Sequence, residues 1–268
     1  MRKPIIFIIG AICVMFLISS VFILNKQGSK KSIPKGEISS VMEKGAQSFA
    51  QGEFLDARNA YKQVLESTQD PQVMEEARGF LEGANMKLLF SPVMDECSTE
   101  YVVKPNDMLI KIAKQYGTTV ALIQRANTLS SHIIRPQQKL KVNTCPFSIA
   151  VDKSQNVLFL KRNGEIFKTY PISTGTNGST PVGTFKIINK LKNPTWFRTG
   201  AVIPPDSPEN ILGSRWMGFD EKGYGIHGTK APDKIGEQVT LGCVRMFNHD
   251  VEELYDVVPV GTEVVIVE

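Results

Sequence analysis

The sequence has few residues that can act as a nucleophile or an acid–base catalyst near neutral pH. Its 268 residues include only 3 histidines and 4 cysteines. It also has little excess charge, because 31 basic residues against 27 acidic residues leave a formal net charge of +4. A charge this small, scattered along the chain, is unlike the basic patch of a nucleic-acid-binding protein, so we expect no nucleic-acid partner. Hydrophobic residues at 42% and charged residues at 22% exclude a mainly disordered chain and a protein with many membrane spans.

Long apolar runs are absent apart from one at the N-terminus. The segment from Ile5 to Leu24 is uncharged and mostly apolar, and it follows Arg2 and Lys3. It has the length of a membrane span and exceeds the roughly 7–15 residues of a signal-peptide core, and no clear cleavage site of small residues follows it. We therefore predict an uncleaved anchor at residues 1–25 and a linker at 26–36. A cleaved signal peptide is the alternative, and either one would export the chain.

Residues 37–92 have apolar positions at helical spacing. The apolar residues on either side of Gly52, which predict a helical hairpin, are Phe49, Phe54, Ala57, Tyr61 and Leu65. A third helix is expected from Pro71 to about Phe90, with an apolar face of Val73, Ala77, Phe80, Leu81 and Ala84. The stretch Ala46 to Leu65 resembles one tetratricopeptide unit. Because such repeats need about three copies to bury a core, we interpret the segment as a spacer, with a protein-binding surface as the alternative.

Residues 97–145 are bounded by two strand-like segments, Tyr101–Val103 and Lys139–Val142. Between them we expect a helix capped by Asn106 or Asp107 and a second short helix near Val120–Ala126. This segment resembles a LysM module at Tyr101, Val102, Val103, Pro105, Asp107, Leu109, Ile112, Ala113, Tyr116, Ile123, Asn127, Pro136, Gln138, Leu140 and Val142. The resemblance implies a β-α-α-β fold that binds an N-acetylglucosamine-containing glycan such as peptidoglycan in a shallow groove. The alternative is a LysM fold that serves only as a rigid spacer.

The cysteines have different predicted roles. Cys97 and Cys145 bracket the LysM-like segment, whose two strands pair antiparallel in that family, so we expect a disulfide and an oxidising compartment; two free buried thiols are the alternative. Cys13 lies in the apolar run and is interpreted as a small hydrophobic residue. Cys243 is left over, and an unpaired cysteine in an exported protein is a candidate reactive thiol.

Residues 146–268 are expected to be mainly β. The predicted strands are Ser148–Asp152, Val157–Lys161, Ile166–Ile172, Thr184–Ile188 and Glu263–Val267. Asn163-Gly164 is typical of a hairpin turn, and a glycine-containing loop is expected from Thr176 to Thr180. The fold class is therefore α+β and multidomain: a transmembrane helix, a three-helix segment, a LysM module and a mainly-β domain.

A thiol needs an adjacent base to become a good nucleophile, and only three histidines could supply one. His132 lies in the LysM-like segment. His249 stands just before an expected helix, where Asp250 and Glu253 suit the cap and its third position, so we interpret it as a surface residue. His227 remains as the candidate base for Cys243, and glycines flank both residues, which permits close approach of a substrate.

The residues around this pair resemble the catalytic domain of the L,D-transpeptidases over Pro146 to Glu268. The signature is His227-Gly228-Thr229 followed by Thr240-x-Gly242-Cys243-Val244-Arg245, with Thr240 where many members have serine. Further matches are Ser173-Thr174-Gly175, Thr180-Pro181-x-Gly183-Thr184-Phe185, Pro194, Trp196, Asn210-x-Leu212-Gly213 and Arg215-Trp216.

The resemblance implies acyl transfer in two steps. His227, oriented by the carbonyl oxygen of Gly228, activates Cys243 to attack a peptidoglycan stem tetrapeptide and release D-alanine, and an amine then resolves the thioester. Backbone N–H groups near Leu241, Gly242 and Cys243 would bind the oxyanion. Arg245 is a candidate anchor for a substrate carboxylate or a structural ion-pair partner. Trp216 and Tyr224 either line the cleft or are core aromatics.

No metal and no cofactor is expected, because the last domain lacks the ligand spacing of a zinc site. The expected partners are the stem peptide and glycan strand of peptidoglycan, the membrane through the N-terminal span, and a protein through the helical segment. We expect a bacterial cell-envelope enzyme whose catalytic domain lies outside the cytoplasm. An L,D-carboxypeptidase or other cysteine hydrolase of peptidoglycan, and a non-catalytic peptidoglycan-binding protein, are the alternatives.

Overall fold

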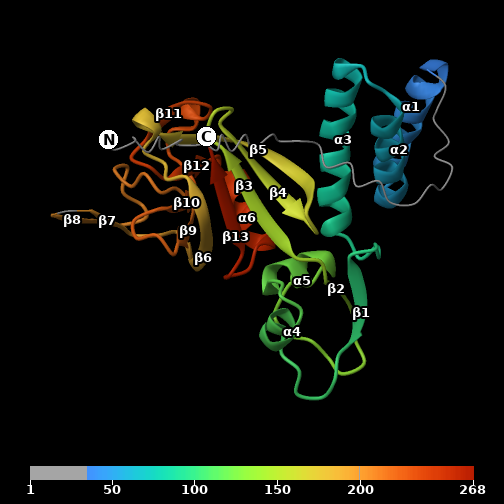
Figure 1. Cartoon of the computed structure of the whole chain (residues 1–268). Coiled ribbons are helices and arrows are strands. Elements are labelled where there is room, and N and C mark those ends of the chain that lie inside the picture. The colour runs from blue at the N-terminus through green and yellow to red at the C-terminus, as the bar shows by residue number, and fades with distance from the viewer. Residues whose placement is uncertain (1–34, 199) are drawn as a thin grey trace, which may run out of the picture. The chain divides into compact units, whose positions relative to one another are not determined.

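Residues 35–198 and 200–268 are described by the computed structural model of the chain (Figure 1). The predicted membrane anchor from Ile5 to Leu24 and most of the predicted linker lie outside the described residues. Within the described ranges, no helix is both long enough and apolar enough to cross a membrane.

Three consecutive helices begin the described chain. A short 3-10 turn, η1 (Lys35–Glu37), leads into α1 (Ile38–Ala50), α2 (Phe54–Ser67) and α3 (Pro71–Leu89). Gly52 joins α1 to α2 with a φ of +80°, a conformation that favours glycine. The Asp70 side chain caps α3 by accepting hydrogen bonds from the backbone N–H groups of Gln72 and Val73. The expected hairpin and third helix are thus present.

The predicted apolar face of α3 is only partly correct. Ala77 and Ala84 are fully buried, but Phe80 is 45% exposed and stacks on Tyr61, with ring centroids 5.4 Å apart. Phe80 therefore lies at the surface, where its ring covers the buried ring of Tyr61, and it does not enter the core.

The C-terminal half of α3 has a second buried side that the sequence did not reveal. The side-chain amide of Asn85 donates to the backbone carbonyl of Phe167 at 3.0 Å. Met86 and Leu89 belong to the hydrophobic core of the last domain. The helical segment is therefore packed against that domain through α3.

Residues 98–143 form the expected β-α-α-β unit from β1 (Ser98–Val102), α4 (Leu109–Gln115), α5 (Val120–Ala126) and β2 (Lys139–Asn143). The two strands pair antiparallel with Ser98 opposite Asn143. This register brings the next residues together, and Cys97 and Cys145 form a disulfide with Cα atoms 5.1 Å apart.

The start of α4 differs from the expected cap. The N-cap residue is Met108, which makes no side-chain capping bond. Asp107 Oδ2 instead accepts from the N–H of Lys104 and the hydroxyl of Tyr101, each at 2.7 Å, while Asn106 has a positive φ of 66°. The polar residues predicted as caps therefore hold the turn between β1 and α4.

The remaining residues form the mainly-β domain. Its strands are β3 (Phe147–Asp152), β4 (Val157–Arg162), β5 (Glu165–Gly175), β6 (Gly183–Lys192), β7 (Trp196–Arg198), β8 (Ala201–Ile203), β9 (Arg215–Phe219), β10 (Gly225–His227), β11 (Gln238–Thr240), β12 (Val244–Met246) and β13 (Glu263–Val267). The short 3-10 segments are η2 (Thr176–Gly178) and η3 (Pro232–Lys234), and the helix is α6 (Asn248–Val257).

Among the described residues, nine of these strands form one sheet in the order β11-β5-β12-β10-β9-β6-β13-β3-β4 (Figure 1). Strand β4 also pairs with the first part of β5, so the sheet closes on itself. The later residues of β5 pair with β12 and β11 instead. The apolar side of α6 (Val251, Leu254 and Val257) is fully buried in the same core as the strands. The pair β7–β8 forms a separate hairpin.

Buried charges link the LysM-like unit to its neighbours. Arg162 on β4 donates to the Asp95 carboxylate at 2.6 Å and to the carbonyl of Cys97 at 3.0 Å. Lys141 on β2 donates to the carbonyls of Leu88 and Ser91 near the end of α3. Burial lowers the pKa of Lys141 to about 8 because desolvation disfavours the ammonium. These bonds satisfy polar groups that would otherwise be buried without partners.

Candidate active site

The sheet brings the two candidate catalytic residues to one place. His227 is the last residue of β10, and Cys243 immediately precedes β12. The two strands pair in parallel, with Ile226 opposite Val244 and His227 opposite Arg245. The short parallel ladder therefore brings the end of β10, with His227, close to the loop that carries Cys243 into β12.

Cys243 and His227 both line one cleft of about 510 Å³. Its walls are mostly apolar, and the lining residues are Leu191, Pro194, Thr195, Trp196, Phe197, Ile211, Leu212, Trp216, Gly223, His227, Val239, Thr240, Leu241, Cys243 and Arg245. No acidic side chain is among these described residues. The cleft therefore combines a thiol, an imidazole and a guanidinium in an apolar setting.

His227 is held in one orientation. It is 2% exposed, and its Nδ1 lies 2.6 Å from the carbonyl oxygen of Gly228. Its ring stacks on Trp216 with centroids 6.1 Å apart. Because a carbonyl oxygen only accepts, Nδ1 carries the proton and Nε2 is left as the basic nitrogen. Burial lowers the pKa of His227 to about 4, with the charge of Arg245 acting in the same direction and the Gly228 hydrogen bond opposing it.

Cys243 is a half-buried free thiol. Its Sγ donates to the carbonyl of Gly223 at 3.6 Å. Burial raises the pKa of Cys243 to about 11, and the backbone hydrogen bond of Gly225 and the charge of Arg245 oppose that rise. With both groups neutral at pH 7, the resting site holds a thiol and an imidazole rather than an ion pair. Attack by sulfur must therefore be accompanied by transfer of its proton to a base.

The loop before the nucleophile is fixed by Thr240. Its Oγ1 accepts from the N–H of Gly242 at 3.1 Å and donates to the carbonyl of Cys243 at 2.7 Å. Gly242 has a φ of +126°, and a Cβ there would lie 2.5 Å from the Tyr224 ring. The Gly242 N–H is thus already bonded to Thr240. The sequence analysis predicted this N–H as an oxyanion donor and did not foresee that bond.

Arg245 faces the cleft without a protein partner. Its Nε is buried and makes no hydrogen bond, and no ion pair holds the guanidinium within the described part of the chain. Burial lowers its pKa, against the influence of Cys243. The structural ion-pair role considered from the sequence has no partner among the described residues.

Of the other residues predicted for the site, some line the cleft and one does not. Trp216 lines the cleft, and Leu241 lies at its mouth with 85% exposure. Tyr224 does not line the cleft; it packs beneath Gly242 against the core.

The remaining histidines lie elsewhere. His249 is exposed and pairs with Asp250 at 3.3 Å, and it lies inside α6, whose N-cap is Phe247, three residues before the expected cap Asp250. Asp250 is consequently in the first turn of the helix and is not its cap. His132 lines a separate groove in the LysM-like unit.

One contributor to the site was missed by sequence reasoning. Asn248 bonds to both the Gly228–Thr229 loop and Ser214. Nothing in the local pattern marks it, because its partners lie far from it in the sequence.

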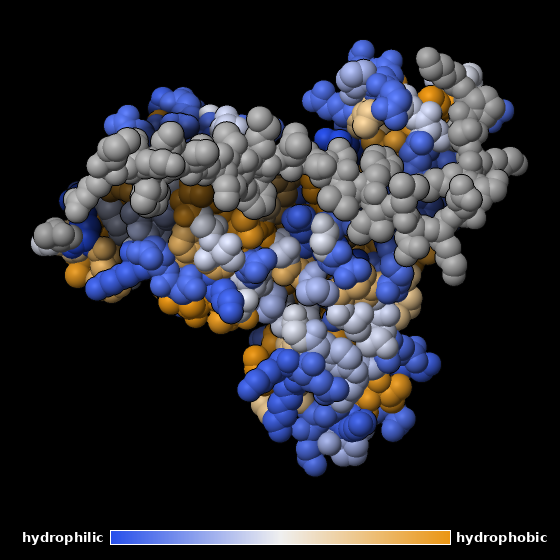
Figure 2. Space-filling view, viewed as in Figure 1, coloured by the Kyte–Doolittle hydropathy of each residue, from blue (hydrophilic) through white to orange (hydrophobic). Residues whose placement is uncertain are grey.

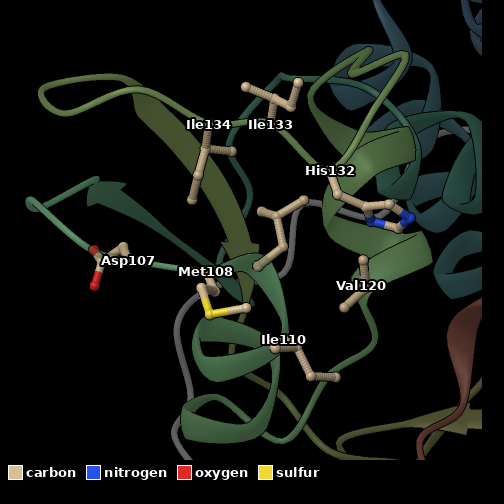
Figure 3. A pocket seen from close by; sticks show the side chains of 8 residues that line it. Asp107, Met108, Ile110, Val120, His132, Ile133 and Ile134 are labelled. Atoms are coloured by element: carbon tan, nitrogen blue, oxygen red, sulfur yellow. The ribbon is translucent and has the colours of Figure 1, made fainter.

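The groove of the LysM-like unit is a second candidate site, of about 480 Å³. Figure 3 shows Ile134, from the loop before β2, pointing toward Met108 at the N-cap of α4, with Asp107 and His132 toward opposite ends. Ile110 and Ile133 are 60% and 77% exposed. Around α4 and α5 hydrophilic side chains predominate, and the hydrophobic ones form small patches (Figure 2).

Comparison with known proteins confirms both resemblances. The L,D-transpeptidase catalytic domain matches residues 146–266, and the LysM domain matches residues 101–143. The resemblance of the helical segment to a tetratricopeptide unit stays a prediction.

Named relatives agree with the catalytic-domain match. A Bacillus subtilis (strain 168) protein named as the L,D-transpeptidase YkuD is 36% identical over 173 residues, covering 62% of this chain and 97% of that protein. An Escherichia coli (strain K12) protein named as the L,D-transpeptidase ErfK/SrfK is 29% identical over 180 residues, covering 58% of each chain. The crystal structure of L,D-transpeptidase 3 from Mycobacterium tuberculosis with a faropenem-derived adduct has a TM-score of 0.40 and 19% identity, over 49% of this chain and 65% of that one. The chain belongs to the L,D-transpeptidase family and is an enzyme of that class, with a LysM domain ahead of its catalytic domain.

Proposed function

We propose that this L,D-transpeptidase uses Cys243 as its nucleophile and His227 as its general base on a peptidoglycan stem tetrapeptide. The observation that carries the proposal is the position of both side chains in one cleft, with His227 Nδ1 bonded to the Gly228 carbonyl. That bond leaves Nε2 as the nitrogen that can accept a proton.

The proposed reaction has two steps, acylation of Cys243 and transfer of the acyl group to an amine. Cys243 Sγ forms a bond to the carbonyl carbon of the donor peptide while its proton moves to His227 Nε2. The tetrahedral adduct collapses with cleavage of the C–N bond to D-alanine, whose nitrogen receives that proton. An acceptor amine then attacks the thioester, gives up a proton to His227, and releases the thiol. The products are a cross-linked peptide and free D-alanine.

Backbone N–H groups near the nucleophile stabilise the oxyanion. Of the proposed donors, the Gly242 N–H already serves Thr240. We therefore assign the larger role to the N–H groups of Leu241 and Cys243, with Gly242 able to contribute only if it releases Thr240. Removal of one such donor costs roughly 3–4 kcal/mol in other acyl-transfer enzymes.

Arg245 recognises the carboxylate of the donor peptide. Its guanidinium is unpartnered in a cleft whose described lining has no acidic side chain. A partly buried cation without a partner has lost some of its hydration, so a substrate carboxylate that pairs with it gains binding energy. The D-alanine that leaves a tetrapeptide carries such a carboxylate next to the scissile bond. Trp216 lines the same cleft and supplies an apolar wall, whereas Tyr224 supports the nucleophile loop from below.

The remaining parts of the chain have proposed roles in placing the enzyme. Residues 1–25 anchor it in the membrane, 26–36 serve as linker, and 37–92 form a helical spacer or bind a protein partner. The LysM domain, assigned to residues 97–145, binds the glycan strand of peptidoglycan through the groove at Met108, Ile110 and Ile133. The catalytic domain, assigned to residues 146–268, then acts outside the cytoplasm, in the cell envelope.

The experiment incubates the full-length chain, in detergent because of its apolar N-terminal run, with purified stem tetrapeptide and an amine acceptor. Mass spectrometry should find the cross-linked dimer and free D-alanine. The Cys243→Ser variant should form neither, because a base suited to a thiol does not generate an alkoxide. A tripeptide product without dimer would instead identify an L,D-carboxypeptidase, in which water resolves the thioester. Equal activity of Cys243→Ser would refute the proposed nucleophile.

A further inference from the structure

The peptide unit between Gly228 and Thr229 is bonded at both ends. Its carbonyl oxygen lies 2.6 Å from His227 Nδ1, and its N–H donates to Asn248 Oδ1 at 3.0 Å. In a trans peptide these two groups are rigidly coplanar and point in opposite directions. The hydrogen bond to Asn248 therefore fixes the direction in which the carbonyl faces His227.

The Asn248 side chain makes two bonds to the loop that contains this peptide and a third to Ser214. Oδ1 also accepts from the N–H of Ser214 at 3.1 Å, and Nδ2 donates to the carbonyl of Thr229 at 2.8 Å. Three bonds to two segments leave the amide one orientation. They also determine which end of the amide is oxygen, since only oxygen can accept from two N–H groups.

Two glycines make room for this amide. A Cβ on Gly228 would lie 2.2 Å from Asn248 Oδ1, and one on Gly213 would lie 2.4 Å from the same atom. Gly213 also has a φ of +63°, which favours glycine. The glycine that follows the base is therefore required by the close approach of Asn248 Oδ1.

Asn248 is not used to cap its own helix. It is the first residue of α6, but the N-cap residue is Phe247, and α6 has no side-chain capping bond. The three bonds of Asn248 all lead away from α6, to Ser214 and Thr229. Helix α6 follows β12 directly. The segment that carries Cys243 therefore also carries the Asn248 amide, which orients the Gly228 carbonyl bonded to His227.

We propose that Asn248 is a positioning residue for the acyl-transfer reaction, acting through the Gly228–Thr229 peptide to keep His227 in the tautomer with the proton on Nδ1. The inference rests on the proposed role of His227 as the base. Donation to Asn248 polarises the peptide and strengthens its carbonyl as an acceptor, as in other chains of hydrogen bonds. Without Asn248 the carbonyl can turn away, and His227 loses the bond that keeps Nε2 free of a proton.

The test compares Asn248→Ala and Asn248→Asp with the neighbouring control His249→Ala in the full-length chain. The probe is a carbapenem, and the acylation rate of Cys243 is followed by mass. Asn248→Ala should slow acylation by roughly 10- to 100-fold, part of the 10²–10⁴ that a positioned base contributes. The carbapenem concentration for half-maximal rate should change little, and His249→Ala should match the wild type.

Asn248→Asp separates positioning from mere structural support. A carboxylate keeps the acceptor for both N–H groups but loses the Nδ2 donor to the Thr229 carbonyl, so it should recover part of the rate that Ala loses. Its charge near His227 should raise the pKa of that imidazole, so the acid limb of the rate profile should move to higher pH. Nitrogen NMR of the labelled histidine should show the Nδ1-protonated tautomer in the wild type and Asp variant, and a mixture in the Ala variant.

Several results would overturn the inference. A wild-type acylation rate in Asn248→Ala is one. Equal slowing by Ala and Asp with an unchanged tautomer is another, because it would mean that Asn248 only supports the fold. If Asn248→Ala does not fold, the Asn248→Asp variant decides: an acid limb of its rate profile at the same pH as in the wild type would refute the positioning role of Asn248. A silent His227→Ala variant would instead refute the proposed base itself, which distinguishes failure of the proposed function from failure of this inference.

Discussion

The cleft of the catalytic domain and the groove of the LysM domain have similar volumes, about 510 and 480 Å³, but their surfaces differ in kind. In the cleft, burial lowers the pKa of His227 to about 4 and raises that of Cys243 to about 11. In the groove, Ile110 and Ile133 are more than half exposed. Desolvated titratable groups indicate a place where protons are moved, whereas exposed apolar side chains indicate contact with a ligand. Volume alone would not separate the two.

The largest expected effect tests the chemical side of this comparison. His227→Ala should slow acylation of Cys243 by a carbapenem by roughly 10²–10⁴, the contribution of a positioned base. Stopped-flow absorbance with mass analysis of the adduct measures it. His249→Ala is the matched control, because His249 lies only six positions beyond Cys243 yet is exposed and pairs with Asp250. A damaging His249→Ala with a silent His227→Ala would show that the base is misassigned.

The second effect concerns the LysM side. Replacing both Cys97 and Cys145 by serine removes a cross-link between residues 48 apart in sequence. The chain-entropy relation gives a loss of about 4 kcal/mol in the free energy of unfolding for a loop of this length. Urea unfolding should show it, and the carbapenem should still acylate Cys243 in the folded double variant.

Thiol counting under denaturing, non-reducing conditions provides the control for that prediction. Cys97 and Cys145 should both be protected, while Cys243 reacts. If every thiol reacts without reductant, the disulfide does not form in the isolated protein and the expected stability loss has no basis.

The third effect follows from the buried imidazole. The folded-state pKa of His227 is about 4, against about 6.5 in an unfolded chain, so between these values the unfolded state binds more protons. The free energy of unfolding should therefore fall as pH falls from 6.5 towards 4, by up to about 3 kcal/mol from this residue. Urea unfolding at several pH values should show a shallower dependence for His227→Gln than for the wild type. Identical slopes would mean that His227 is not buried in its neutral form.

Much of this arrangement could be predicted from the sequence. The strands of the catalytic domain appear as short apolar runs between turns, and β3, β4, β5, β6 and β13 begin or end within a few residues of the predicted positions. The pairing of β10 with β12 brings His227 close to the loop that carries Cys243, but only the family resemblance pointed to this beforehand.

The unpredicted features depend on particular side-chain contacts that helical periodicity and capping patterns do not encode. Asn248 bonds to residues 19 and 34 positions away, which no local pattern encodes. Phe80 matches the helical period but lies at the surface beside Tyr61. Asp107 has the chemistry of a cap, yet its carboxylate is used by Lys104 and Tyr101.

The smallest expected effect tests the binding side of the comparison. Ile133 is 77% exposed at the LysM groove, so Ile133→Asp should not disturb folding. It should weaken sedimentation with purified peptidoglycan sacculi by about tenfold. The apolar area that Ile133 would bury against the glycan contributes roughly 1–2 kcal/mol to binding. The variants are made in a Cys243→Ala background so that no turnover occurs.

Ile166→Asp is the matched control, since Ile166 is an isoleucine of the catalytic domain that is 50% exposed. It introduces the same charge on a surface outside both cavities, so any general repulsion from sacculi appears in both variants. Ile133→Ala removes the contact without adding charge and should retain most of the effect. If Ile133→Asp and Ile166→Asp sediment equally well, the groove does not hold the glycan, and its exposed apolar side chains need another explanation.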